Sequence, residues 1–214
     1  MHVLITGANR GIGKAMLDQY SAAGASVTGT QRGAGDLHRL DVADPASIRT
    51  LAESMADAPL DLLVCNAGVY ADKGQSLDDG YPPQMWAEGF ATNVTGAFLT
   101  VQAFLPHLRR SKAGKIAIIS SQMASDTRAP GGSYIYRASK AAALNLGRNL
   151  STDLARDGIS VGIYHPGWVR TDMGGAAAEI SVEESATGLI ARFAALGPEN
   201  TGCFETWDGQ QHPY

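Results

Sequence analysis

The chain has 214 residues, of which 44% are hydrophobic and 18% are charged, and its formal net charge is −4. This is enough apolar material for one well-buried core but too short a chain for two ordinary domains, so we expect a single domain over residues 1–214. An acidic balance without a lysine- or arginine-rich stripe gives little support to binding of nucleic acid or of anionic membranes.

Short β-branched runs alternate along the chain with longer segments of helical periodicity, a rhythm typical of a parallel sheet covered by helices on both faces. The predicted strands are residues 3–6, 26–30, 37–42, 60–66, 115–120, 160–164 and 202–206. The predicted helices are residues 12–23, 45–56, 86–110, 136–156 and 182–196. The expected fold class is therefore α/β, with a doubly wound, parallel, seven-stranded sheet.

A glycine-rich segment joins the first predicted strand to the first helix. It reads Thr6-Gly7-Ala8-Asn9-Arg10-Gly11-Ile12-Gly13, with the spacing G-x-x-x-G-x-G rather than the more familiar G-x-G-x-x-G. Glycines at such a turn let the backbone approach a pyrophosphate, and the helix N-terminus offers free N–H groups and a partial positive charge. We predict a dinucleotide-binding Rossmann fold, although a tight turn without a ligand is the alternative. The residues expected at the cofactor are Gly7, Asn9, Arg10, Gly11, Ile12 and Gly13.

The residues after the second predicted strand bear on which nicotinamide cofactor binds. An acidic residue here would accept hydrogen bonds from the ribose 2′-hydroxyl, but the sequence has Gln31 and Arg32. With no carboxylate to repel it, a 2′-phosphate could be bound by Arg32 together with Arg10 reaching the same spot. We predict that Gln31 and Arg32 contact NADP(H), with NAD(H) as a possible substitute. A solvated loop charge is the alternative for Arg32.

The connection from the second to the third predicted strand is unusually short. Only residues 31–36 intervene, whereas a parallel crossover normally takes a dozen or more residues and contains a helix. An extended link of about 20 Å could just span the return. We therefore expect the helix between these strands to be missing and the sheet to be thinly covered there.

Two further strand ends belong to the same predicted pocket. Asp41 and Val42 end the third strand and could hold the adenine. Asn66-Ala67-Gly68 ends the fourth strand, where small residues would let the backbone pass close to the ribose. An ordinary turn is the alternative for Asn66-Ala67-Gly68.

Tyr136 and Lys140 are the strongest candidates for catalysis. At positions i and i+4 of a predicted helix, the phenol and the ammonium group lie on one face, one turn apart. The cation, with the positive nicotinamide of an oxidised cofactor, is expected to lower the tyrosine pKa from about 10. Tyr136 could then donate or accept a proton while hydride moves, and Lys140 could also hold the nicotinamide ribose. Ser121 would hydrogen-bond the same oxygen, and Asn93 could fix a water that passes protons to Lys140.

Two neighbours compete for these roles. Tyr134 lies close to Tyr136 in sequence, but only Tyr136 has a lysine four residues later, so Tyr134 is expected to line the substrate pocket or to pack. Ser120 is the rival of Ser121, because predicted strand ends are uncertain by a couple of residues.

Taken in order, these motifs resemble those of the short-chain dehydrogenase/reductase family. The resemblance runs from residue 3 to about residue 207 and rests on the glycine loop, on Asn66-Ala67-Gly68, on Asn93, Ser121, Tyr136 and Lys140, and on Pro166-Gly167 with Thr171. It implies that Pro166, Gly167, Val169 and Thr171 lie at the nicotinamide. Residues 134–145 and 166–173 and the segment Trp207-Asp208-Gly209 resemble the C-factor and sniffer-type carbonyl reductase branch.

The resemblance implies an NADP(H)-dependent oxidoreductase that reduces aldehydes or ketones of small molecules to alcohols, or runs in reverse, as a homo-dimer or homo-tetramer. The residues expected at the substrate are Ser121, Tyr134, Tyr136 and Trp168. Residues 172–181 form a shorter covering segment than in many relatives, which indicates an open, permissive site. A non-catalytic NADP(H)-binding signalling protein and a cofactor-retaining epimerase or dehydratase are the alternatives.

The N-terminus lacks the basic segment and long apolar stretch of an export signal, and no stretch approaches the ~18 apolar residues of a membrane span. Cys65 and Cys203 both lie in apolar runs, which favours reduced thiols over a disulfide. We therefore expect a cytoplasmic protein. The scattered histidines show no paired spacing with the cysteines, so we expect no metal site.

Overall fold

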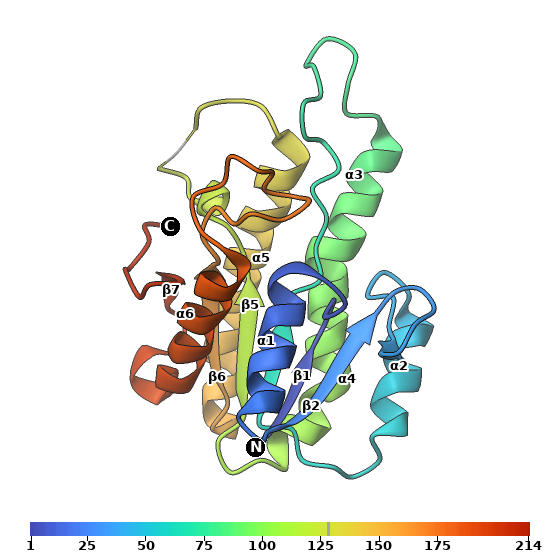
Figure 1. Cartoon of the computed structure of the whole chain (residues 1–214), viewed down its shortest axis with the longest axis vertical. Helices are drawn as coiled ribbons and strands as arrows, with labels where there is room; N and C mark the ends of the chain where they lie inside the picture. The colour runs from blue at the N-terminus through green and yellow to red at the C-terminus, as the bar shows by residue number, and fades with distance from the viewer. Residues whose placement is uncertain (128) are drawn as a thin grey trace.

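Seven strands pair in parallel in the computed structural model, which describes residues 1–127 and 129–214. The strand order is β3-β2-β1-β4-β5-β6-β7 (Figure 1). The strands are β1 His2–Ile5, β2 Ser26–Gln31, β3 His38–Arg39, β4 Leu62–Cys65, β5 Lys115–Ile119, β6 Ser160–His165 and β7 Phe204–Thr206. The predicted doubly wound, parallel Rossmann sheet is confirmed.

Helices cover both faces of this sheet (Figure 1). They are α1 Gly11–Ala22, α2 Pro45–Ser54, α3 Pro83–Phe90, α4 Ala97–Arg109, α5 Tyr134–Leu154 and α6 Val182–Ala195. Alternate strand residues point to opposite faces, as strand geometry requires. Val3 and Ile5 pack with α1 and α6, whereas Leu4 and Leu63 pack with α2, α4 and α5. Two apolar cores therefore hold the sheet between two helical layers.

The absence of a helix between the second and third strands is also confirmed, since residues 32–37 form bends only. Leu37, in this connection, packs against the core under α1 and so covers part of the exposed edge. The third strand is shorter than predicted because pairing with β2 ends at Arg39. The chain then turns toward α2, where the Asp41 side chain accepts a hydrogen bond from the Ala43 N–H at 3.0 Å.

The long helix predicted at residues 86–110 begins earlier, at Pro83, and is interrupted by a π-helical segment, Ala91–Gly96. Gly96 is needed at its end because a Cβ there would lie 2.5 Å from the Val42 carbonyl oxygen. Such π-helical turns occur often at functional sites. This one carries Asn93, one of the residues predicted to act in catalysis.

Candidate active site

A cavity of about 620 Å³ lies at the carboxyl ends of the strands, on either side of the point where the strand order reverses between β1 and β4. This is where ligands bind in open α/β sheets. Every residue predicted to contact the cofactor lines it, except Gln31, Gly167 and Val169.

The three exceptions make structural contacts close to residues that line the cavity. Gln31 is buried, and its side-chain amide donates a hydrogen bond to the Gly33 carbonyl at 3.3 Å. Val169 is buried and pairs with Ile180 in a short parallel bridge. Gly167 has a φ of +86°, and a Cβ there would lie 2.5 Å from the Ile180 side chain. All three hold loop conformations.

The glycine loop fits tightly against the segment after β4. Gly7 has a φ of +66°, and a Cβ there would lie 3.1 Å from the Cα of Ala67. A Cβ on Gly13 would lie 2.3 Å from the Gly7 carbonyl oxygen and 2.6 Å from the Asn66 amide nitrogen. The Asn66 amide in turn donates hydrogen bonds to the carbonyl oxygens of Thr6, at 2.9 Å, and Gly7, at 3.0 Å.

This loop leaves the N-terminus of α1 facing the cavity without a cap. Arg10 occupies the N-cap position, has an extended backbone and makes no capping hydrogen bond with its side chain. The free N–H groups and the positive end of the helix dipole therefore suit an anion. A cradle without side chains next to such a helix end fits the pyrophosphate of a dinucleotide.

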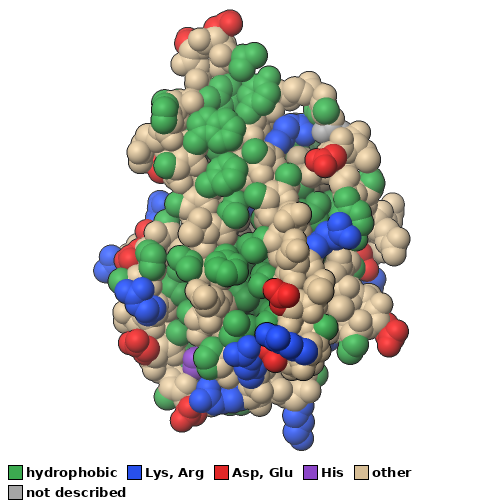
Figure 2. All heavy atoms as spheres, turned by 180° about the vertical axis from the view of Figure 1, so that it is seen from behind, with side chains coloured by type: hydrophobic (Ala, Val, Ile, Leu, Met, Phe, Trp, Pro, Cys, Tyr) green, Lys and Arg blue, Asp and Glu red, His purple; other side chains and the backbone are tan. Residues whose placement is uncertain are grey.

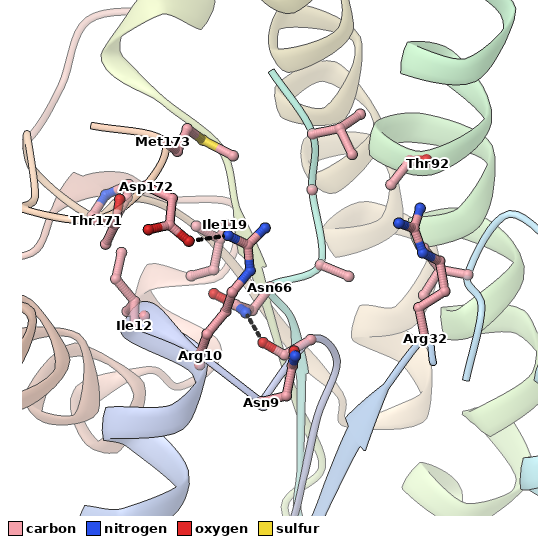
Figure 3. Close-up of a pocket in the computed structure, with 18 of the residues that line it drawn as sticks. Asn9, Arg10, Ile12, Arg32, Asn66, Thr92, Ile119, Thr171, Asp172 and Met173 are labelled. Carbon is pink, nitrogen blue, oxygen red and sulfur yellow. Dashed lines mark hydrogen bonds and ion pairs between the residues drawn. The ribbon is translucent and has the colours of Figure 1, made fainter. Parts of the chain in front are cut away.

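The two arginines of the cavity lie apart. Arg10 forms an ion pair with Asp172, whereas Arg32 is seen on the opposite side of the cavity (Figure 3). The two arginines therefore do not meet in this structure, and their joint binding of a 2′-phosphate stays a prediction. Arg10 is directed elsewhere because Asp172, which directly follows Thr171, brings a carboxylate over the glycine loop.

Several residues that line the cavity were not predicted from the sequence. They belong to no motif of their own and stand within two positions of a predicted residue. They include Leu40, Val69, Thr92, Arg170, Asp172 and Met173. Only their adjacency to Asp41, Gly68, Asn93 and Thr171 could have indicated them.

Tyr136 and Lys140 lie one turn apart on α5 and both line the cavity. Their exposed fractions are 8% and 5%. The Lys140 ammonium nitrogen lies 5.6 Å from the centroid of the Tyr136 ring and donates a hydrogen bond to the Ile119 carbonyl oxygen at 2.9 Å. The Lys140 ammonium group is therefore anchored at the end of β5, close to the Tyr136 ring.

Burial dominates the titration of this pair. The pKa of Tyr136 is raised to about 12, chiefly by desolvation; a hydrogen bond with the Ser121 side chain lowers it, and the nearby Tyr70 and Asp72 raise it. Desolvation also lowers the pKa of Lys140 to about 8. In the protein alone the pKa of Tyr136 is therefore raised rather than lowered, mainly by burial. The lowering expected with an oxidised nicotinamide beside the phenol stays a prediction.

The structure separates the two candidate serines. The Ser120 hydroxyl donates to the Lys140 backbone carbonyl at 2.9 Å and is 1% exposed, so it joins β5 to α5. The Ser121 side chain interacts with the Tyr136 phenol and accepts a hydrogen bond from the Met123 N–H at 3.1 Å. Ser121 is therefore the hydroxyl beside the phenol, although Ser120 and not Ser121 is among the residues that line the cavity. We favour Ser121 because the Ser120 hydroxyl is already engaged by the Lys140 carbonyl.

We expect Ser121→Ala to lower kcat/KM by about 10²-fold, the usual effect of removing one hydrogen-bond donor to a developing oxyanion. Ser120→Ala is the matched control. It should instead lower the free energy of unfolding by about 1 kcal/mol, because it removes one buried hydrogen bond. Steady-state kinetics and thermal unfolding of both variants test this assignment, and a larger kinetic effect for Ser120→Ala would reverse it.

Asn93 lies in the π-helical segment and is 4% exposed. Its amide oxygen accepts from the Val69 N–H at 2.8 Å, and its amide nitrogen donates to the Val69 carbonyl and the Ser139 hydroxyl, both at 2.9 Å. A Cβ on Gly68 would lie 3.3 Å from this oxygen and 3.4 Å from the Lys140 ammonium nitrogen. Asn93 therefore joins the loop after β4 to α5, and the water it was expected to hold stays a prediction.

The two remaining predicted substrate residues lie outside the cavity wall. Tyr134 is 39% exposed and packs edge-on against Tyr81 at 5.2 Å between ring centroids. Trp168 is 44% exposed, and its indole N–H donates to the Gly174 carbonyl at 3.0 Å. The aromatic ring nearest the phenol is Tyr70, which no motif indicated and which stacks on Tyr136 at 4.2 Å.

Among the described residues, no group of three or more histidine, cysteine, aspartate or glutamate side chains is placed to hold a metal ion. None of the helices in the described parts of the chain is long and apolar enough to cross a membrane.

Comparison with known proteins identifies a family and several similar proteins. The family model described as short chain dehydrogenase matches residues 1–180. The C-signal protein of Myxococcus xanthus is 35% identical over 168 residues, which cover 78% of this chain and 100% of that protein. The NADPH-bound carbonyl reductase from chicken fatty liver superposes with a TM-score of 0.90 at 30% identity, covering 100% of this chain and 98% of that one. The carbonyl reductase Sniffer of D. melanogaster superposes with a TM-score of 0.84 at 25% identity, covering 100% and 99%.

Proposed function

Because the chain belongs to the short chain dehydrogenase family, in its C-factor and sniffer-like branch, we propose that it is an NADP(H)-dependent oxidoreductase that reduces small aldehydes and ketones, or oxidises the alcohols. The observation that carries this proposal is the buried pair of Tyr136 and Lys140, which shares one cavity with the glycine loop. This arrangement supports the proposal, because the proposed proton donor and the proposed dinucleotide-binding loop border the same space.

In this proposal Tyr136 donates its phenolic proton to the carbonyl oxygen of the substrate. Ser121 holds the same oxygen, and Lys140 holds the ribose and keeps positive charge beside the phenol. The cofactor, when bound, supplies the hydride and, in its oxidised form, a further positive charge. A raised tyrosine pKa keeps the phenol protonated at neutral pH, which suits the direction of carbonyl reduction.

The preference for NADP(H) rests on Arg32. Arg32 lines the cavity at the end of β2. A guanidinium there can bind a 2′-phosphate bidentately. Two solved relatives were crystallised with this cofactor. They are the chicken carbonyl reductase with NADPH and a short-chain dehydrogenase from Burkholderia cenocepacia with NADP.

We expect Arg32→Ala to raise the dissociation constant of NADPH by about tenfold or more while that of NADH stays within about twofold, since only NADPH loses a charge-assisted hydrogen bond. Arg39→Ala is the matched control, because Arg39 is an exposed arginine on β3 that does not line the cavity. Fluorescence titration with both cofactors measures the effect. Equal losses of NADPH and NADH affinity in Arg32→Ala would contradict the assignment.

A second function is favoured by the similarity to the C-signal protein, namely a non-catalytic NADP(H)-binding regulator. It needs the cradle but has no use for a buried phenol and ammonium group in contact with the cavity. Loss of NADPH absorbance with a panel of aldehydes, ketones and quinones separates the two proposals. Cofactor binding without turnover of any of these compounds would favour the regulator.

We further propose that the chain forms a homo-dimer or homo-tetramer. A band of hydrophobic side chains runs along the face opposite to that of Figure 1 (Figure 2). Trp86 on α3 and Phe98 on α4 are exposed by 36% and 38%. Apolar surface of this kind is typical of a protein interface.

A further inference from the structure

The loop after β4 carries a buried carboxylate that the proposed chemistry does not use. Asp72 is 1% exposed. Its carboxylate accepts a hydrogen bond from the Ile135 N–H at 2.8 Å, and both of its oxygens accept from the Tyr136 N–H, at 3.2 and 3.3 Å. In residues 1–127 and 129–214, no cationic side chain forms an ion pair with it. Its partners are thus the backbone donors of α5.

These donors belong to the first turn of the helix that carries the proposed acid. The residue at the N-cap position, Ser133, has a left-handed backbone with φ of +51° and makes no capping hydrogen bond with its side chain. Asp72 therefore satisfies the free N–H groups that a local cap would otherwise satisfy. Its negative charge also lies at the positive end of the α5 dipole, where it is favourable.

The same short loop holds the Tyr136 side chain. The Tyr70 ring stacks on the Tyr136 ring at 4.2 Å with 20° between their planes, and its hydroxyl shares a hydrogen bond with Ser133 at 2.5 Å. The start of the loop is fixed by Asn93, which binds both the N–H and the carbonyl of Val69. Backbone and ring of Tyr136 are therefore both positioned from one segment.

We propose that Asp72 is a positioning residue of the reaction, which fixes the first turn of α5 so that the Tyr136 phenol stands at the cavity and which places a negative charge next to that turn. This inference rests on the proposed function only in taking Tyr136 as the acid. Asp72 contacts neither the cavity nor the reacting atoms, since it is absent from the cavity wall.

Because Asp72 carries a charge, it should affect the pKa of Tyr136, which an uncharged structural contact would not do. The titratable and charged groups that face Tyr136 are Tyr70 and Asp72 on the loop after β4 and Lys140 on its own helix, and the end of β5 contributes the uncharged Ser121. Burial is the main cause of the raised pKa of Tyr136, and Asp72 adds to it because a negative charge near a phenolate is unfavourable. Removing the Asp72 charge should therefore lower the tyrosine pKa.

The test compares Asp72→Asn with Asp61→Asn. Asp61 also accepts hydrogen bonds from a backbone N–H, that of His2 at 2.8 Å, and from the Ser111 hydroxyl at 2.6 Å, but it lies just before β4, at the other end of the sheet. The pH dependence of kcat and the NADPH dissociation constant are measured for both variants. We expect Asp72→Asn to shift the limb governed by Tyr136 to lower pH and to lower kcat by up to about 10²-fold through misplacement of the phenol. Asp61→Asn should leave the profile in place.

A second readout does not need turnover. Tyrosine labelled isotopically at Cζ is followed by NMR as the pH rises, and the Tyr136 signal is assigned from Tyr136→Phe. We expect that signal to titrate at lower pH in Asp72→Asn than in the wild type and in Asp61→Asn. If Asp72→Asn does not fold, Asp72→Ser, a neutral capping residue, makes the same comparison.

An unchanged Tyr136 titration and an unchanged kcat profile in the neutral variant would overturn the role of Asp72. Absence of turnover in the wild type would instead contradict the proposed function, and the NMR titration would still decide the inference. A uniform loss of kcat, with no shift in the pH dependence of kcat or in the NMR titration of Tyr136, would mean that Asp72 only caps the helix. This result would also overturn the proposal.

Discussion

Tyr136→Phe is expected to lower kcat/KM for carbonyl reduction by about 10²–10⁴-fold, the usual contribution of a positioned general acid. The substitution keeps the ring, and with it the stacking on Tyr70 at 4.2 Å, but removes the hydroxyl that we propose donates a proton to the substrate oxygen. The NADPH dissociation constant and the free energy of unfolding should therefore change little. Steady-state kinetics, cofactor titration and thermal unfolding of one preparation measure all three quantities.

Tyr134→Phe is the matched control for this prediction. It also removes a phenolic hydroxyl, but from a tyrosine two residues earlier whose side chain is 39% exposed and does not line the cavity. Its kinetics should stay close to those of the wild type. A Tyr136→Phe variant as active as the wild type, or a Tyr134→Phe variant that is equally impaired, would contradict the assignment of the acid.

Gly13→Ala is expected to damage the dinucleotide cradle itself. The added Cβ would lie 2.3 Å from the Gly7 carbonyl oxygen and 2.6 Å from the Asn66 amide nitrogen, so backbone must shift. Overpacking of this kind costs about 1–3 kcal/mol, and if the cost falls on the bound state the NADPH dissociation constant rises by roughly 5–150-fold. Isothermal titration with NADPH measures the loss of affinity, and thermal unfolding measures the loss of stability.

Gly197→Ala serves as the control for an added methyl group. A Cβ on Gly197 meets nothing within 4 Å, and alanine keeps the N–H that donates to the Asn200 side chain at 2.7 Å. This variant should bind NADPH as the wild type does. Wild-type affinity in Gly13→Ala would show that the loop does not cradle the cofactor.

The sheet and the glycine loop could be predicted because their signals are local. Each strand is a short apolar run, and the turn after β1 needs glycine both for a φ of +66° at Gly7 and for close packing at Gly13. The spacing of Tyr136 and Lys140 is likewise a property of a single helix. The short connection before β3 could be recognised from its length alone.

The features that escaped prediction depend on contacts between distant segments. Asp72 caps a helix that begins more than 60 residues later, so no local capping pattern indicates it. The direction of the Tyr136 pKa follows from its burial, which becomes known only when loop and helix are assembled. Arg10 turns toward Asp172 for the same reason, since a carboxylate on a distant loop lies within its reach.

Transfer of deuterium from labelled cofactor to product tests the central claim most directly. NADPH carrying deuterium at C4 of the nicotinamide is mixed with the protein and a panel of aldehydes and ketones, and the products are examined by mass spectrometry. A hydride-transferring oxidoreductase with Tyr136 as its acid predicts alcohols with deuterium on the carbinol carbon, formed by the wild type and almost absent with Tyr136→Phe. Retention of all deuterium in the cofactor across the panel, with NADPH demonstrably bound, would contradict it.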